Sequence, residues 1–362
     1  MQDERAMREA LKLARNGLGN TSPNPMVGAL VIAAGDTIAG RGFHAHAGAD
    51  HAEVVALREA GERARGATLY ITLEPCAHQG QTPPCVDAII AAHPARVVIA
   101  LEDPDERVRG KGVAALRAAG ITVDVGVLQA QAAHANRMYL HQRGSGLPFV
   151  TLKMAQSLDG KVAPKAGERV QLTGKRAQRL VRTLRFEHDA VMVGAGTVIV
   201  DDPQLTVRPY KPRRVPYTRI VVDAHGRLPL RAKILKDQLR ARTIVVTTDQ
   251  MPPDLKEQLQ SRSISVLECS RDRNGLVDLH DALRRLAALQ LVSILCEGGP
   301  TLAASLLGDR LASELLWFVA PVILGADAIS VVGASETPVD LEADGVRRLG
   351  DDFALSAHLK RA

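Results

Sequence analysis

The sequence predicts two layered α/β domains in one chain. Its 362 residues are too many for one typical domain and suit two. Short apolar segments typical of strands alternate with amphipathic segments typical of helices, and this alternation favours layered α/β folds. The segment 141–148, rich in glycine and polar residues, interrupts the alternation and is the predicted linker. We therefore expect one domain over residues 1–145 and another over residues 146–362.

The elements of the first domain follow from the spacing of its apolar residues. Runs of Val, Ile and Leu mark strands, whereas apolar residues three or four positions apart mark helices. The predicted strands cover residues 27–33, 67–74, 96–102 and 122–127. The predicted helices cover residues 3–16, 51–64, 84–92, 110–119 and 129–142.

The same patterns predict a second series of strands and helices after the linker. The strands cover residues 149–155, 190–196, 219–224, 243–248, 292–299 and 315–324. The helices cover residues 174–187, 278–290 and 300–308. Two strands end in glycine turns, VGAGT at 193–197 and EGGPT at 297–301. Backbone N–H groups at such turns can bind a pyrophosphate, although a purely structural turn has the same sequence. Neither turn has the Rossmann spacing, so that fold is not predicted.

Composition and charge narrow the class of protein. Apolar residues make up 46% of the chain and charged residues 24%, as in ordinary globular proteins. The net charge of +6 suits a phosphorylated small molecule as well as it suits nucleic acid. Aromatic residues, which stack on unpaired bases, amount to only 3%. We therefore expect a small-molecule partner and no nucleic acid.

The chain also lacks the signals of membrane proteins and secreted proteins. No apolar run is long enough to span a bilayer, and the charged N-terminus has no apolar secretion signal. Four irregularly spaced cysteines do not form a disulfide framework. A reducing cytoplasm is the expected compartment.

Two of these cysteines belong to a pattern that predicts a zinc site. His51 opens a predicted helix, Cys76 follows a predicted strand, and Cys85 opens the next helix. Three such ligands leave a fourth zinc position open, where bound water has its pKa lowered to about 7 and supplies hydroxide. Glu53 can then move the proton of that water. An isolated His-Ala-Glu is common by accident, but the full H-x-E…P-C…C order is that of zinc deaminases.

Six segments along nearly the whole chain form a distinctive series, namely SPNPMVGALV, GFHAHAGADHAEVVAL, LYITLEPCAHQGQTPPC, PFVTLKMAQSLDGKVA, VGAGTVIVDDPQLTVR and EGGPTLAASLL. In this order they resemble the bifunctional deaminase-reductase family of riboflavin biosynthesis. The resemblance implies a cytidine-deaminase-like α/β/α domain followed by a dihydrofolate-reductase-like α/β domain. It implies Zn²⁺ and NADPH as cofactors, a phosphorylated pyrimidine as substrate, and a homo-oligomer, either dimer or tetramer.

The resemblance also implies two reactions and the residues that serve them. The first domain removes an amine from 2,5-diamino-6-(5-phosphoribosylamino)pyrimidin-4-one, and the second reduces the ribose of the product to a ribityl chain. The expected pyrimidine-site residues are Asn24, His44, His78 and Asp103. The expected NADPH-site residues are Ala155, Thr197, Asp201, Gly299, Pro300, Thr301 and Leu302. The expected substrate residues of the second domain are Arg185, Leu205, Arg208 and Glu297. Lys153 and Asp201 are the expected catalytic pair that orients and protonates the ribose.

Four positions depart from the family pattern. Gln81 and Asp105 replace a cation and an asparagine near the first site, which should weaken the binding of a phosphorylated ribose. Arg169 and Gln171 replace a serine and a tryptophan near the second. These departures leave open a paralogue that acts on a related pyrimidine, including one in which only one half is active. A nucleic-acid base deaminase is disfavoured by the eight residues between the two cysteines. An inactive scaffold is disfavoured because the zinc motif is complete.

Overall fold

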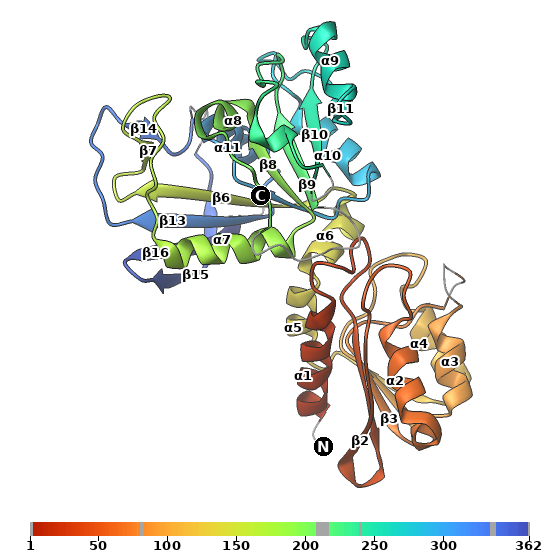
Figure 1. The fold of residues 1–362 in the computed structure, drawn as a ribbon. Coiled ribbons are helices and arrows are strands. Elements are labelled where there is room, and N and C mark those ends of the chain that lie inside the picture. The colour runs from red at the N-terminus through yellow and green to blue at the C-terminus, as the bar shows by residue number, and fades with distance from the viewer. Residues whose placement is uncertain are drawn as a thin grey trace. The chain divides into compact units, whose positions relative to one another are not determined.

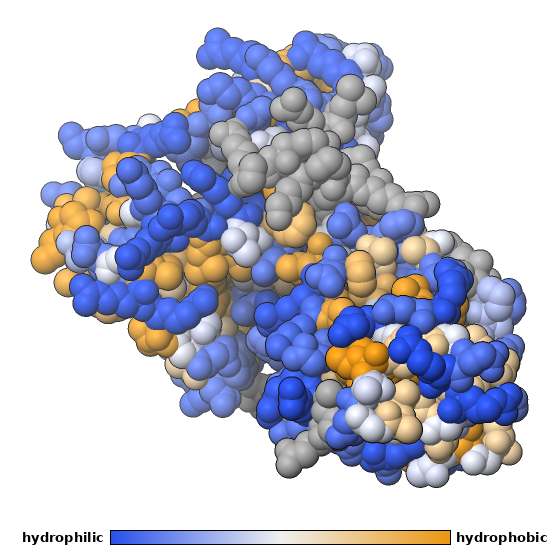
Figure 2. Space-filling view, turned by 60° about the horizontal axis from the view of Figure 1, so that its bottom comes forward, coloured by the Kyte–Doolittle hydropathy of each residue, from blue (hydrophilic) through white to orange (hydrophobic). Residues whose placement is uncertain are grey.

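The computed structural model describes residues 3–77, 79, 83–207, 217–238, 241–333 and 338–360. The chain forms two compact units, Met1–Gly146 and Leu147–Ala362 (Figure 1). Within the described ranges, every helix is too short or too polar to cross a membrane. Hydrophilic side chains are interspersed with smaller hydrophobic areas over the face seen in Figure 2.

A five-stranded sheet in the order β2-β1-β3-β4-β5 forms the centre of the N-terminal unit. Its strands are β1 (Gly28–Ala33), β2 (Thr37–Phe43), β3 (Thr68–Ile71), β4 (Arg96–Ile99) and β5 (Thr122–Val125). The β1 strand pairs antiparallel with β2 and β3, and the remaining pairs are parallel. The α-helices are α1 (Asp3–Ala14), α2 (Ala52–Ala60), α3 (Cys85–Ala92), α4 (Lys111–Ala118), α5 (Gln129–Ala135) and α6 (Arg137–Ser145). Short 3₁₀ turns lie at Arg15–Gly17, Ala34–Asp36 and Gly61–Ala64.

Side chains of this sheet alternate between two apolar cores. Ala29 and Val31 of β1 face the core that holds α2, α3 and α4. Leu30 and Ile32 face the core that holds α1 and α5. This alternation is expected of a strand, and it gives a three-layered unit with α2 and α3 on the same side.

The C-terminal unit is built on a nine-stranded sheet in the order β11-β10-β9-β8-β12-β6-β13-β16-β15. Its strands are β6 (Phe149–Ser157), β8 (Ala190–Gly194), β9 (Tyr217–Val222), β10 (Ala241–Thr247), β11 (Ser265–Glu268), β12 (Ser293–Cys296), β13 (Glu314–Ala320), β15 (Leu341–Leu349) and β16 (Asp352–Leu359). The β13–β16 and β16–β15 pairs are antiparallel, and the others are parallel. Strands β7 (Lys161–Ala163) and β14 (Ile329–Ser330) form a separate small sheet.

Helices cover both faces of the large sheet. They are α7 (Lys175–Glu187), α8 (Ala195–Asp201), α9 (Pro253–Gln260), α10 (Leu279–Ala288) and α11 (Pro300–Gly308), with a 3₁₀ turn at Lys233–Leu235. Ile294 and Cys296 of β12 face the core of α10 and α11, whereas Leu295 faces α7. The helices α8 and α9 contribute to a third core beside β8, β9 and β10. Cys296 and Cys269 are therefore core residues.

The structure corrects several predicted elements. The predicted linker at 141–148 is helical up to Ser145, and Gly146 ends α6 with a φ of +73°. The predicted helix 129–142 is two helices, because Asn136 bonds through its side chain to both backbone groups of Met26. The predicted strand and turn at 190–197 become a helix from Ala195 onward. The strands β2, β15 and β16 were missed, since their sequences contain many polar or small residues.

Candidate active sites

Three soft ligand side chains converge in the N-terminal unit. His51, Cys76 and Cys85 have ligand atoms that all lie within 4.8 Å of one another. The Nδ1 atom of His51 is 2.9 Å from the Cys85 sulfur and 3.7 Å from the Cys76 sulfur. The structure therefore brings together the three residues that the motif predicts.

The three side chains come together because they lie at the starts of α2 and α3 and in the segment after β3. His51 is the extended residue that precedes α2, and its carbonyl accepts a hydrogen bond from Val55. Cys85 is the first residue of α3, where its backbone N–H donates to the Cys76 sulfur at 3.4 Å. Cys76 lies in the segment that follows β3, so its sulfur reaches both helix starts.

The electrostatics of these side chains fit a cation. The Cys85 thiol donates toward Cys76 and, together with His51, lowers the pKa of the Cys76 thiol to about 4. The same pairing and burial raise the pKa of the Cys85 thiol. Two thiolates cannot share this half-buried site without a positive charge, and Zn²⁺ prefers one His and two Cys of this kind. The donor set therefore fits zinc.

Glu53 stands in the first turn of α2 with its side chain turned into the protein. It is 3% exposed, and its Oε2 atom has no hydrogen-bond partner in the described part of the chain. Burial raises the pKa of its carboxyl group. The charge of His51 lowers that pKa but offsets only part of the rise. A buried carboxylate with an unused oxygen can take up and release a proton near neutral pH.

Asn24 and His44 lie beside the same site. The Asn24 amide donates to Nε2 of His44 at 3.2 Å, and Nδ1 of His44 donates to the Asp50 carbonyl at 3.2 Å. The ring of His44 meets that of His51 edge to face at 5.2 Å. Burial lowers the pKa of His44, which keeps it neutral. These polar groups can meet the edge of a base.

A buried carboxylate that the sequence did not single out organises the neighbouring loop. Glu74 accepts hydrogen bonds from the backbone N–H groups of Asp103, Gly110, Gly112 and Val113. It thereby fixes both Asp103 and the start of α4. Its position between β3 and Cys76 was the available sequence signal.

The predicted substrate residue Asp103 is buried and bonded within this loop. It accepts from the Tyr139 hydroxyl at 3.1 Å and from the backbone of Asp105 at 2.9 Å. The Asp105 carboxylate pairs with Arg107 at 2.6 Å and lies 3.8 Å from Arg143. The bond from Arg107 holds the pKa of Asp105 at about 2. The positive charges of Arg107 and Arg143 therefore balance the negative charge of Asp105, which stands where the family has an asparagine. His78 and Gln81 lie outside the described residues.

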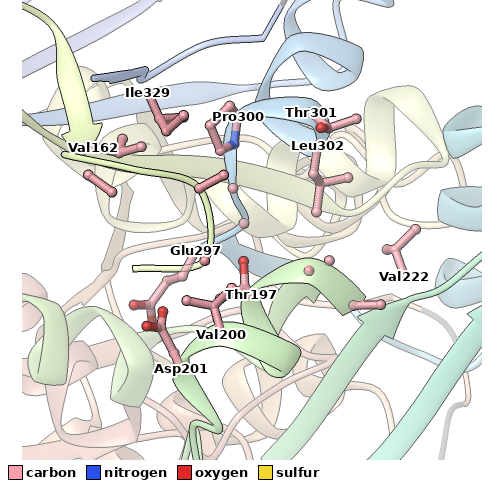
Figure 3. Close-up of a pocket in the computed structure, with 18 of the residues that line it drawn as sticks. Val162, Thr197, Val200, Asp201, Val222, Glu297, Pro300, Thr301, Leu302 and Ile329 are labelled. Atoms are coloured by element: carbon pink, nitrogen blue, oxygen red, sulfur yellow. The ribbon is translucent and has the colours of Figure 1, made fainter. Parts of the chain in front are cut away.

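A cavity of about 470 Å³ opens at the end of β12 in the C-terminal unit (Figure 3). We call it the β12 cavity. All seven residues expected to meet NADPH line it, namely Ala155, Thr197, Asp201, Gly299, Pro300, Thr301 and Leu302. Gly299 immediately precedes α11, so the turn and helix start lie where the sequence predicts them.

A second cavity of about 600 Å³, the α7 cavity, adjoins the first one. Arg182 and Arg185 of α7 line it together with Leu205. Lys153, Arg169, Asp201 and Glu297 line both cavities. These four residues therefore mark the junction at which two bound molecules can meet. Arg208 lies outside the described residues.

Partly buried charges concentrate at this junction. Glu297 binds Arg185 through two contacts of 2.5 and 3.0 Å, and Lys153 Nζ lies 3.9 Å from it. Burial favours the neutral acid, but the charges of Arg185 and Lys153 outweigh it and lower the pKa of Glu297. Burial lowers the pKa of Lys153, while it raises the pKa of Asp201. Shifted pairs of this kind favour proton transfer.

The two remaining departures lie on the loop before α7. Arg169 has its Nε 3.7 Å from Asp201, although its side chain is 71% exposed. Gln171 lines the α7 cavity and donates to the Thr173 carbonyl at 3.1 Å. Arg169 is therefore a second cation near Asp201, in addition to Lys153, at a position where the family has a neutral serine.

Comparisons with known proteins agree with this arrangement. Residues 1–101 match the cytidine and deoxycytidylate deaminase zinc-binding region, and residues 148–355 match the RibD C-terminal domain. The riboflavin biosynthesis protein RibD of Aquifex aeolicus is 40% identical, with 98% of this chain and 97% of that protein covered. The chain belongs to the RibD family.

Solved RibD structures extend the likeness to the whole fold. RibD of Acinetobacter baumannii is 37% identical with a TM-score of 0.89, and 99% of each chain is covered. A deaminase/reductase from Thermotoga maritima is 32% identical with a TM-score of 0.85, again over 99% of each chain. RibD of Escherichia coli is 41% identical over 91% of this chain and 90% of its own.

Membership of the RibD family confirms the predicted fold class and the type of enzyme. The chain is a zinc-binding deaminase domain followed by a RibD reductase domain, and it belongs to riboflavin biosynthesis.

Proposed function

We propose that this RibD protein deaminates 2,5-diamino-6-(5-phosphoribosylamino)pyrimidin-4-one and then uses NADPH to reduce the ribose of the product. The observation that carries the first step is the convergence of His51, Cys76 and Cys85 beside the unpartnered oxygen of Glu53. The second step is supported by a cavity whose buried charges adjoin a second, cation-lined cavity.

In the deaminase unit, His51, Cys76 and Cys85 would hold the zinc. A zinc ion with an open position supplies the Lewis acidity that makes water nucleophilic near neutral pH. Glu53 takes the proton of the attacking water on its free Oε2 and delivers it to the departing amine. Asn24 and the neutral His44 orient the pyrimidine through its polar edge. Burial raises the pKa of Glu53, which makes its carboxylate a stronger acceptor for the proton of the water.

In the reductase unit, the turn at Gly298 and Gly299 would hold the cofactor pyrophosphate against the start of α11. NADPH supplies the hydride. Lys153 and Asp201 stand at the junction of the cavities, where they orient the ribose and provide a proton. Glu297, itself paired with Arg185, attracts Lys153 by charge, and the α7 cavity receives the phosphorylated sugar.

The experiment follows both steps with the purified full chain. We expect ammonia release from the pyrimidinone and, with NADPH present, stoichiometric loss of absorbance at 340 nm, the nicotinamide absorption band. A related pyrimidine without phosphoribose serves as control. Faster turnover of that control would contradict the proposed substrate, and a lack of NADPH oxidation on deaminated product would contradict the second step.

Two further proposals concern the state of the protein in the cell. The four cysteines are free thiols, two of them at the candidate metal site, which supports a reducing cytoplasm. We also keep the prediction of a homo-oligomer. Light scattering during size-exclusion chromatography checks it against the 38.8 kDa mass of one chain.

A further inference from the structure

One side of the α7 cavity is formed by a segment without regular structure. Gln204, Leu205 and Thr206, which we call segment 204–206, line the cavity shortly after α8. Leu205 has a φ of +48°, in the left-handed region that a leucine rarely adopts. Its side chain is 6% exposed and packs in the apolar core beside β8, β9 and β10. The surrounding protein must therefore hold this backbone in an unfavourable conformation.

A fully buried arginine lies behind this segment. Arg219, in the middle of β9, is 0% exposed. Its guanidinium donates hydrogen bonds to three main-chain carbonyls, those of Gln204 at 3.3 Å, Lys236 at 2.8 Å and Ala241. Burying a charge in this way is costly unless its donors are satisfied, and carbonyl oxygens satisfy them here. Arg219 therefore links segment 204–206 to the residues that lead into β10.

The residues just before segment 204–206 are held against the same part of the chain. The backbone N–H of Lys233 donates to the Asp202 carboxylate at 2.8 Å, and Lys233 Nζ lies 3.2 Å from that carboxylate. This ion pair is largely exposed, so water and salt weaken it. The bond from Arg219 to the Gln204 carbonyl lies in the interior, and it is therefore the firmer of the two attachments.

The bond from Arg219 sets the direction of the peptide group that joins Gln204 to Leu205. This peptide is trans, so its C=O and N–H point to opposite sides. Since the C=O points to Arg219, the Leu205 N–H points away from it. This N–H has no hydrogen-bond partner among the residues that the structure describes. A backbone donor without a partner, in a residue that lines a cavity, is available to a bound molecule.

We infer that Arg219 is a positioning residue of the reductase, whose guanidinium holds the Gln204–Leu205 peptide so that the Leu205 N–H donates to the phosphorylated sugar. This inference rests on the proposed function, because it places the sugar in the α7 cavity. Arginine suits this task because its planar fork of five N–H donors reaches several carbonyls at once. The single nitrogen of a lysine cannot span all three, and an apolar side chain binds none of them.

Steady-state kinetics of the full chain on deaminated product test this role. Arg219→Met keeps the length of the side chain and removes its donors. We expect kcat/KM for the sugar substrate to fall at least about tenfold, mainly through a higher KM, the scale of one lost charged hydrogen bond. The affinity for NADPH should stay unchanged, because segment 204–206 does not line the β12 cavity. Arg219→Lys should lie between Arg219→Met and wild type.

Arg242→Met is the matched control. Arg242 stands on the neighbouring strand β10, donates to the Thr218 hydroxyl at 2.8 Å and lines neither cavity. Its loss removes a comparable arginine bond from the same sheet without touching segment 204–206. Thermal unfolding of each variant shows how much stability is lost, so a change in KM can be separated from a general loss of stability.

The outcomes separate this inference from the proposed function. An unchanged kcat/KM in folded Arg219→Met, an equal loss in Arg242→Met or an equal weakening of NADPH binding overturns the role of Arg219 and leaves the reductase in place. If Arg219→Met does not fold, Arg219→Lys decides: a higher KM with unchanged NADPH affinity supports the role, and an unchanged KM overturns it. Failure of both variants to fold shows a structural role alone. If the wild-type chain does not reduce deaminated product, the proposed reductase function fails as well.

Discussion

At the scale of single residues, Glu53 combines burial with an unused oxygen beside three potential metal ligands. Glu53→Gln keeps the shape of the side chain but removes its ability to exchange a proton. We expect zinc content to stay unchanged and ammonia release to fall by about 10² to 10⁴-fold, the usual contribution of a general acid–base group. Elemental analysis and an ammonia assay measure the two effects. Glu62→Gln, an exposed change just beyond α2, should leave both unchanged.

The partly buried Lys153 predicts how reduction depends on pH. A lysine that donates a proton is active in its charged form, which is lost as the pH rises through its pKa. Burial lowers this pKa from the ordinary 10.5, and the charge of Glu297 restores only part of it. The kcat of the reductase should therefore fall on the alkaline side at a pH below 10.5.

Lys153→Arg tests the origin of this alkaline fall. Arginine stays protonated throughout the accessible range, so any activity that remains should lose the alkaline fall. Lys175→Arg, an exposed change at the start of α7, should keep the wild-type profile. An identical alkaline limb in Lys153→Arg would show that another group controls it.

The residues of the candidate zinc site could be selected from the sequence because their spacing is itself the signal. His51, Glu53, Cys76 and Cys85 lie at element ends that periodicity also locates. Glu74 was not predicted, since its four backbone partners lie between 29 and 39 residues downstream. The pairing of Asp105 with two arginines could not be predicted from the sequence either, because it depends on how α6, which carries Arg143, packs near the loop of Asp105.

At the scale of elements, glycines in β2 let α2 approach the sheet. A Cβ atom on Gly42 would lie 1.9 Å from the carbonyl oxygen of Ala52, in the first turn of α2. Gly42→Ala must therefore displace the helix start that carries His51 and Glu53. We expect a loss of about 1–3 kcal/mol in unfolding free energy, typical of overpacking, together with weaker zinc retention. Gly144→Ala, which has open space around it, should do neither.

Denaturant unfolding and dialysis against a chelator measure both effects of Gly42→Ala. Wild-type stability and zinc retention in that variant would contradict the close approach. The same glycines explain why β2 was missed, since TIAGRGF has neither continuous apolar residues nor strict alternation. Helices such as α7 and α10 were predicted because their apolar spacing and, in α10, the Asp278 cap are local signals.

At the scale of the whole molecule, the candidate residues for deamination and those for reduction lie in separate units. The zinc motif lies within Met1–Gly146, and the paired cavities lie within Leu147–Ala362. The sequence predicted this division because the two groups of motifs fall on either side of one glycine-rich segment. The exposed edge strand β15 was not predicted, as its charged residues obscure the period of a strand.

Two variants should therefore disable the two reactions independently. Cys76→Ser combined with Cys85→Ser removes two zinc ligands, so zinc content and ammonia release should be lost while NADPH reduces deaminated product normally. Gly299→Leu places a large side chain immediately before α11, where a Cβ atom alone would be at an ordinary contact distance of 3.5 Å from Thr197 Oγ1. NADPH binding should weaken at least about tenfold, the scale of one lost charged hydrogen bond, with zinc and deamination retained.

An equimolar mixture of these two variants provides the decisive measurement. Each protein keeps one unit unchanged, so at an NADPH concentration well below the dissociation constant of Gly299→Leu the mixture should form the reduced product much faster than either variant alone. Product formation followed by mass spectrometry, with wild-type enzyme as reference, gives the extent of recovery. If Gly299→Leu also loses zinc, or if the mixture forms only deaminated intermediate, the two units depend on each other and the separation of their chemistry is wrong.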